Sequence, residues 1–361
     1  MHRLTDRDET LTVEALRLRP LSVPLIEPFI IATGRVDATR AVEIEVQIRR
    51  GAARATGLGE AACLPPVTLE DQPDVIAALE RIAARLPARL ERGERWEGLG
   101  PVSRAGLDTA LSDALSRIDG VALRTWMGGP AGPATLETDV TIAIATPAKM
   151  AELACGWVAR GFRALKVKVG KDLDADVRAL EAIGRAAPTA TLRVDANAAY
   201  TARQALELAG ACQRLGLRVE CWEQPCAASD LQGMAEVSRA LPAPVIADES
   251  VKTLRDVEAL VKAPYAGGIN LKLAKTGSLD ECVRMGRLAR KAGLRLMVGG
   301  MVETRLGMTA AAHVACAIGG VDFVDLDTAW LLADDPYRGG YDAVGPLYAL
   351  PQRPGLGVTR R

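Results

Sequence analysis

The feature that most constrains the fold of this chain is a repeat that extends from about residue 138 to residue 327. Short apolar segments, each ending in a polar residue or glycine, alternate with longer segments that have helical periodicity. The ends of successive apolar segments lie 24 to 28 residues apart, at Lys168, Asp195, Glu223, Asp248, Lys272, Val298 and Asp325. Eight such segments, with seven helical patterns between them, predict an α/β fold, a (β/α)7β TIM-like barrel.

We expect the eight strands to span residues 138–144, 164–169, 192–197, 219–225, 244–250, 268–273, 294–300 and 322–327. An open, doubly wound sheet is the alternative fold for a βα repeat. That fold often carries a G-x-G-x-x-G sequence after its first strand, and no such sequence follows the first predicted strand here. The regular spacing therefore favours the barrel.

The first 130 residues have a different pattern. Residues 14–23 and 41–62 read as antiparallel strands with a turn at Gly51, and residues 71–86 and 104–120 read as helices. We therefore expect an N-terminal α+β capping domain over residues 1–130, and the Gly- and Pro-rich stretch 127–134 marks its end. The barrel would occupy residues 131–335, and residues 336–361 would pack back on the capping domain.

Composition excludes several classes of function. The 45 basic and 45 acidic residues balance, so nothing indicates binding to nucleic acid or to an anionic membrane. No apolar run is long enough to span a bilayer, and the seven cysteines form no C-x-x-C pair, which favours the reducing cytoplasm. The only histidines are His2 and His313, which nearly excludes a Ser-His-Asp triad or a multi-histidine zinc site.

Charged residues gather where the predicted strands end, which is where barrels of this kind have their active sites. Three successive strands end in a carboxylate, namely Asp195, Glu223 and Asp248. An oxygen-rich set without His or Cys suits a hard cation, and we expect Mg²⁺. The alternative is that each acid only caps the helix that follows it.

Lysines flank these carboxylates in the strand order. Lys166 and Lys168 alternate with apolar residues, so they share the inward face of one strand, and Lys272 ends a strand on the other side of the carboxylates. If the metal held a substrate carboxylate, it would stabilise the enediolate formed when the α-proton leaves. Lys168 and Lys272 would remove and return that proton, and we expect the positive charge of the metal and of Lys166 to lower the lysine pKa.

With these residues the chain resembles the enolase superfamily, specifically its muconate lactonising subgroup. The stretches that carry the resemblance are KVKVG (166–170), RVDAN (193–197), WEQP (222–225), IADES (246–250), INLKLAKTG (269–277) and, in the first domain, GLGEA (57–61). In that superfamily a lysine or histidine base works with Mg²⁺. The resemblance therefore implies Mg²⁺ at Asp195, Glu223 and Asp248, with Lys168 and Lys272 as the bases and Lys166 as electrostatic support.

Three further stretches resemble the dipeptide epimerases of the subgroup: LETDVTI (136–142), GGMVETRLGMTAAAH (299–313) and DLD (325–327). The resemblance implies an isomerase that inverts the α-carbon of the C-terminal residue of a dipeptide by two-base 1,1-proton transfer. It implies that Asp325 and Asp327 hold the substrate α-ammonium, which two carboxylates on one face would suit. It also places Thr138, Asn197 and Lys166 at the substrate, and it suggests a homo-oligomer.

One departure concerns the specificity loop near residues 28–35. Members of the family that act on Ala-Glu carry an arginine there, whereas this chain has Gly34 at the aligned position with Arg35 beside it. We therefore expect a dipeptide other than Ala-Glu, and Phe29, Ile30 and Ile31 favour an apolar residue.

Other functions remain as alternatives. Within the subgroup they are an N-acylamino acid racemase, an o-succinylbenzoate synthase and a muconate cycloisomerase. Outside it they are a Schiff-base lyase that uses Lys168 or Lys272 as the nucleophile, and a non-catalytic binding protein.

Overall fold

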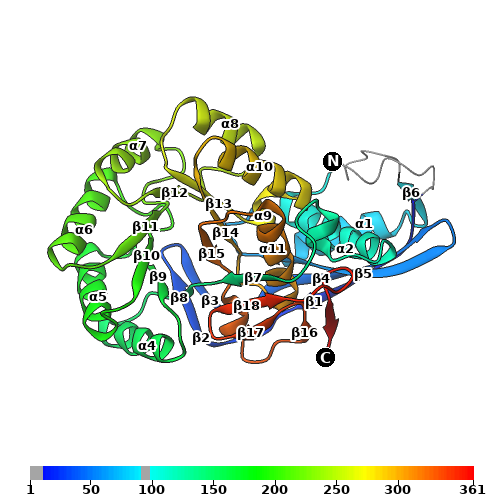
Figure 1. Cartoon of the computed structure of the whole chain (residues 1–361), viewed down its shortest axis with the longest axis horizontal. Helices are drawn as coiled ribbons and strands as arrows, with labels where there is room; N and C mark the ends of the chain where they lie inside the picture. Colours follow the sequence, from blue (N-terminus) through cyan, green and yellow to red (C-terminus); the bar gives the residue numbers. More distant parts are fainter. Residues whose placement is uncertain (1–10, 91–97) are drawn as a thin grey trace.

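The computed structural model describes residues 11–90 and 98–361. Eight parallel strands form one sheet in the order β15-β14-β13-β12-β11-β10-β9-β8. Their bounds are β8 (Val140–Ile142), β9 (Ala164–Lys168), β10 (Thr191–Asp195), β11 (Val219–Glu223), β12 (Val245–Ala247), β13 (Gly268–Leu271), β14 (Arg295–Gly299) and β15 (Phe323–Asp325). Seven of them lie within the predicted spans, and β10 begins one residue before its predicted span. The predicted barrel fold is confirmed (Figure 1).

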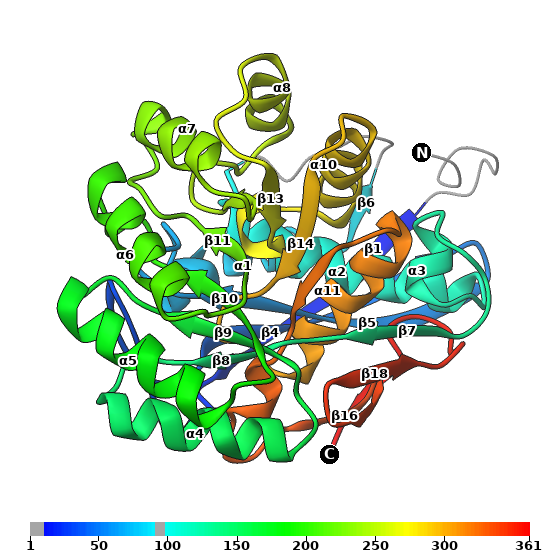
Figure 2. The same cartoon turned by 60° about the vertical axis from the view of Figure 1, so that its left-hand side comes forward.

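Helices surround this sheet and connect its strands (Figures 1 and 2). They are α4 (Pro147–Ala159), α5 (Leu173–Ala186), α6 (Ala202–Arg214), α7 (Leu231–Ala240), α8 (Leu254–Lys262), α9 (Leu273–Thr276), α10 (Leu279–Lys291) and α11 (Arg305–Ile318). Between the first and last strands, the amide N of Asp139 donates to the carbonyl oxygen of Val324 at 3.0 Å. This contact brings the two ends of the sheet together.

In the described part of the chain, no helix is long and apolar enough to cross a membrane.

The N-terminal domain is an antiparallel sheet covered by helices, as the sequence predicts. Its sheet has the order β5-β4-β1-β6, from β1 (Leu11–Leu21), β4 (Arg40–Arg50), β5 (Ala53–Cys63) and β6 (Ala88–Leu90). The helices are α1 (Gln72–Ala83), α2 (Pro101–Ile118) and the short α3 (Leu123–Trp126), and β2 (Pro24–Ile31) and β3 (Gly34–Ala38) form a separate hairpin.

The glycines of the GLGEA stretch have a packing role in this domain. A Cβ on Gly59 would lie 2.1 Å from the carbonyl oxygen of Gly106, and one on Gly57 would lie 2.0 Å from that of Ala110. Only glycine therefore lets α2 lie this close to β5.

The last residues contact the N-terminal sheet. Strand β19 (Val358–Arg360) pairs with β16 (Tyr337–Gly339), and the Arg360 guanidinium lies 2.9 Å from Glu43 and 2.7 Å from Glu45 of β4. Strand β18 (Leu347–Leu350) pairs with β17 (Asp342–Val344) and with β7 (Ala134–Glu137). The C-terminal segment thus bridges the start of the barrel region and the N-terminal sheet.

Candidate active site

The two lysines of β9 point into the barrel. Their neighbours Leu165, Val167 and Val169 are fully buried on the other face of the strand, as the alternation predicts. The Lys166 Nζ lies 2.7 Å from the Glu223 Oε2 and 2.7 Å from the Asp325 Oδ2. Its distance to the Asp195 Oδ2 is 3.1 Å. Lys166 therefore touches carboxylates from three different strands.

Lys168 lies one pleat further along the strand. Its Nζ is 2.6 Å from the Asp195 Oδ2 and donates to the Asn197 Oδ1 at 3.3 Å. Asn197 has a φ of 43°, in the left-handed region that asparagine tolerates, and its backbone N–H donates to the Asp195 Oδ1 at 2.9 Å. The turn after β10 therefore fixes both partners of Lys168.

Lys272 approaches from the opposite side. It follows β13 directly, and its Nζ lies 2.8 Å from the Asp248 Oδ2. In the order of the eight strands, β13 is four positions from β9, so the two strands lie across the barrel from each other. Lys168 and Lys272 line one cavity, together with Lys166, Asp325 and Asp327.

The three carboxylates Asp195, Glu223 and Asp248 end β10, β11 and the segment after β12, and all are buried. They do not cap the helices that follow them. The side chains of Thr201, Asp230 and Thr253 cap α6, α7 and α8. The helix-cap alternative is therefore wrong for all three acids.

The structure adds two residues that the sequence reasoning missed. The Asn270 Nδ2 donates to the Glu223 Oε1 at 2.8 Å, and the Gln224 Oε1 accepts from the Asp248 backbone N at 2.8 Å. Asn270 lies two positions before Lys272, so its place on the inward face was readable from the strand alternation. Gln224 gave no such signal, because it acts from a left-handed turn with φ 34° after β11.

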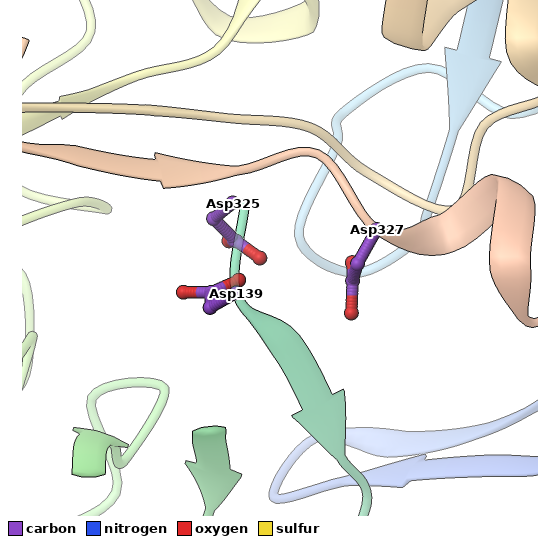
Figure 3. Close-up of side chains that lie close together, drawn as sticks. All are labelled: Asp139, Asp325 and Asp327. Atoms are coloured by element: carbon purple, nitrogen blue, oxygen red, sulfur yellow. The ribbon is translucent and has the colours of Figure 1, made fainter. Parts of the chain in front are cut away.

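The aspartates of the DLD stretch lie with a third one, Asp139, as Figure 3 shows. Single carboxylate oxygens of Asp139, Asp325 and Asp327 all lie within 4.8 Å of one another. Asp139 pairs with the Arg193 Nη1 at 2.8 Å, and an oxygen of Asp327 accepts from the backbone N of Thr141. Asp325 and Asp327 line the cavity, whereas Asp139 lies behind them and does not.

Thr138 has a different place from the one the sequence suggested. It is buried, and its Oγ1 accepts from the backbone N of Leu326 at 2.9 Å, so it holds the DLD stretch against the start of β8. Thr141, three residues later, lines the cavity instead.

The charges of the site shift its pKa values in opposite directions. Burial raises the pKa of Asp195 and Asp248, but the lysines beside them outweigh it and hold both below their usual range. Burial lowers the pKa of Lys272, but Asp248 outweighs it and leaves the net value raised, and Asp325 and Glu223 do the same to Lys166. The expected lowering of the lysine pKa relies on the charge of a bound metal ion and stays a prediction.

Among the three carboxylates Asp195, Glu223 and Asp248, only Glu223 has a raised pKa. Burial and the charge of Asp195 raise its pKa. Its Oε2 is buried and accepts no hydrogen bond, although the Lys166 Nζ is 2.7 Å away. A further positive charge beside this oxygen would therefore be stabilising.

Apolar side chains wall the cavity on the side of the N-terminal domain. Phe29 and Ile31 of β2 contribute, with Leu64 and Val67 from the loop after β5, and Met301 and Val302 face them from the barrel. Ile30 points away, because side chains alternate along β2.

The arginine of the hairpin turn is not part of this wall. Arg35 pairs with Asp37 at 2.8 Å, and both side chains are more than half exposed. A Cβ on Gly34 would meet no atom within 4 Å. Among the described residues that line the cavity there is no arginine.

Comparison with known proteins agrees with this geometry. The family model described as Enolase C-terminal domain-like matches residues 149–361, which is more than half of the chain. The chain belongs to the enolase superfamily. The matched range contains Lys166, Lys168 and Lys272 and the three carboxylates.

Relatives extend the match over both domains. The aromatic dipeptide epimerase of Herpetosiphon aurantiacus is 37% identical over 96% of this chain and 99% of its own length. The L-Ala-D/L-Glu epimerase of Bacillus subtilis is 31% identical over 94% of each chain. A crystal structure of the dipeptide epimerase from Enterococcus faecalis with Mg and L-Leu-L-Tyr has a TM-score of 0.87 and 28% identity. The match covers 97% of this chain and 100% of the Enterococcus faecalis chain. This enolase-superfamily chain is an isomerase, of the epimerase and racemase class.

Proposed function

We propose that this protein is a dipeptide epimerase that inverts the α-carbon of the C-terminal residue. The observation that carries the proposal is the pair Lys168 and Lys272, which line one cavity from opposite sides of the barrel. Two bases on opposite faces of one carbon are what a 1,1-proton transfer requires, because the proton leaves on one face and returns on the other.

In this scheme the lysine without a proton removes the α-proton, and the protonated lysine across the cavity delivers one to the other face. Each has a neighbour that holds its Nζ in place, Asp195 for Lys168 and Asp248 for Lys272. Lys166, fully buried among carboxylates, stays cationic and supplies fixed positive charge beside the substrate. The opposite reaction exchanges the roles of the two bases.

Asp195, Glu223 and Asp248 fit Mg²⁺. They offer only carboxylate oxygens from three adjacent strands, which suits a hard cation, and the Glu223 Oε2 has no hydrogen bond. When bound, Mg²⁺ would supply positive charge to the substrate carboxylate and oppose the rise in lysine pKa. The tighter set Asp139, Asp325 and Asp327 is the weaker candidate, because Asp139 does not line the cavity and already pairs with Arg193.

Asp325 and Asp327 suit the substrate α-ammonium. Each binds a protein donor through one oxygen, Lys166 for Asp325 and the Thr141 backbone for Asp327, which leaves the other oxygen of each. A cationic group accepted by two carboxylates makes strong, charge-assisted hydrogen bonds.

The apolar wall supports a substrate with an apolar side chain. An acidic side chain placed against Phe29, Ile31 and Leu64 would be desolvated with no arginine to pair with it. We therefore propose dipeptides such as L-Ala-L-Phe or L-Ala-L-Leu as substrates in preference to L-Ala-L-Glu.

Isotope exchange tests the proposal. The protein is incubated in D₂O with Mg²⁺ and a library of L,L-dipeptides, and mass spectrometry follows deuterium at each α-carbon. We expect uptake at the C-terminal residue, with apolar residues exchanging faster than glutamate, and loss of exchange in excess EDTA. N-acylated amino acids serve as the control, because they lack the ammonium. Exchange of these compounds but of no dipeptide would contradict the proposal and favour an N-acylamino acid racemase.

A further inference from the structure

Lys275 is a buried lysine that the proton transfer does not use. It lies on α9, three residues after Lys272, and does not line the cavity that Lys272 lines. Its side chain is almost completely buried, so its charge needs partners inside the protein.

The Lys275 Nζ contacts four oxygen atoms, three in the segment after β12 and one within β13. It lies against the Asp248 Oδ1, and it donates to the carbonyl oxygens of Asp248 at 2.7 Å, Asn270 at 2.9 Å and Val251 at 3.3 Å. An ammonium group has three donors and no acceptor, so every one of its hydrogens is engaged. Lys275 therefore ties the segment after β12 to the end of β13.

These contacts divide the two oxygens of Asp248. The Oδ1 faces Lys275, and the Oδ2 faces Lys272 at 2.8 Å. The backbone N of Asp248 is held in addition by the Gln224 Oε1 at 2.8 Å. Because its backbone N and its Oδ1 are held, the carboxylate keeps the orientation in which its Oδ2 faces Lys272, a residue that lines the cavity.

We propose that Lys275 is a positioning residue, which fixes Asp248 so that only its Oδ2 is presented to a divalent cation. This inference rests on the metal site of the proposed function but not on the identity of the substrate. Removal of a partner that orients a metal ligand typically lowers metal affinity by roughly 10- to 100-fold.

The experiment titrates the full-length protein with Mn²⁺ alone, without any dipeptide, and follows binding by electron paramagnetic resonance. We expect Lys275→Met to weaken Mn²⁺ binding by about 10- to 100-fold. The matched control is Lys291→Met, at an exposed lysine on α10, which should bind as the wild type does. Because Lys275 acts through Asp248, Asp248→Asn with Lys275→Met should bind no more weakly than Asp248→Asn alone.

Wild-type affinity in a Lys275→Met protein with an unchanged melting curve would overturn the proposal. If Lys275→Met does not fold, Lys275→Gln replaces it, since the amide keeps two donors for the backbone carbonyls. A folded Gln variant with wild-type affinity overturns the proposal, and a Gln variant that also fails to fold overturns it in favour of a purely structural lysine. Weakened Mn²⁺ binding in a protein whose wild type exchanges no dipeptide would overturn the proposed substrate and leave the role of Lys275 intact.

Discussion

At the scale of the residue, strand alternation and strand ends were enough to predict most of the mouth of the barrel. Lys166, Lys168 and Lys272 face inward because the polar member of each alternating pair must leave the packed face. The sequence did not predict Asn270 as a partner of Glu223 or Lys275 as a partner of Asp248. Glu223 and Asn270 lie on β11 and β13, which β12 separates, and Lys275 lies on the short helix α9. Alternation gives the face that a side chain takes on its own strand, but not the side chain that it meets on another element.

The pKa of Lys272 depends on geometry that the sequence does not show. The sequence shows which charges gather at the mouth of the barrel. Whether burial lowers the lysine pKa or a carboxylate raises it depends on the distance between the two groups. With Asp248 at 2.8 Å from Lys272, attraction outweighs burial.

The two bases should be separable by substitution. Lys168→Ala and Lys272→Ala should each lower epimerisation at least about 100-fold, because each removes the base on one face. Each variant should still exchange the α-proton of one epimer with solvent, and the retained epimer should differ between them. Mass spectrometry in D₂O with separate L,L and L,D dipeptides measures this. Loss of exchange with the same epimer in both variants would contradict a base on each face.

At the scale of the element, the contact between β5 and the start of α11 joins the two domains beside the cavity. Glu60 of β5 accepts from the backbone N–H groups of Thr304 at 3.0 Å and Gly307 at 2.9 Å, at the N-terminus of the helix. Glu303 lies beside it and accepts from the Met301 N–H at 2.8 Å. The GLGEA stretch was recognisable in the sequence, but its glutamate could not be paired with Glu303, which is remote along the chain.

This pair should make stability depend on pH. Burial and the charge of Glu303 raise the pKa of Glu60 to about 8, and burial raises the pKa of Glu303, so the pair retains a proton that the unfolded chain releases near pH 4.5. The stabilisation is complete below that pH and is lost as the pH rises through about 8.

Glu303→Gln keeps a neutral side chain at every pH. Between pH 6 and pH 9 we expect the free energy of unfolding of the wild type to fall by about 1–2 kcal/mol more than that of the variant. Urea denaturation at both pH values measures the difference, and Glu236→Gln, at an exposed position on α7, is the control. Parallel pH profiles for wild type and Glu303→Gln would show that the pair holds no proton.

At the scale of the whole molecule, the C-terminal segment, residues 336–361, is tied to the N-terminal sheet by ion pairs of Arg360. We propose that the chain divides near residue 130 and that residues 336–361 return to the first domain. Arg360 pairs with Glu43 and Glu45, and the buried Glu43 also accepts from the Tyr337 hydroxyl. The repeat pattern gave the barrel, but it did not give these partners, because residues after the last strand follow no period.

Loss of the Arg360 ion pairs should destabilise the folded protein. Arg360→Ala leaves the buried carboxylate of Glu43 with fewer partners, and we expect it to lower the free energy of unfolding by about 1–3 kcal/mol, less than a fully buried pair because Arg360 is partly exposed. Arg361→Ala is the matched control, since its partner Asp334 is exposed and the change should stay within about 0.5 kcal/mol. Chemical denaturation of both variants provides the measurement. An equal loss of stability in the two variants would contradict a stabilising role for the Arg360 ion pairs.

The apolar wall has an evolutionary consequence. Phe29, Ile31, Leu64 and Val67 lie in the first domain, whereas the lysines and carboxylates lie on the barrel strands. Under the proposed function, evolution could therefore change the preferred substrate side chain through a few substitutions in the first domain, while the residues that transfer the proton stay the same.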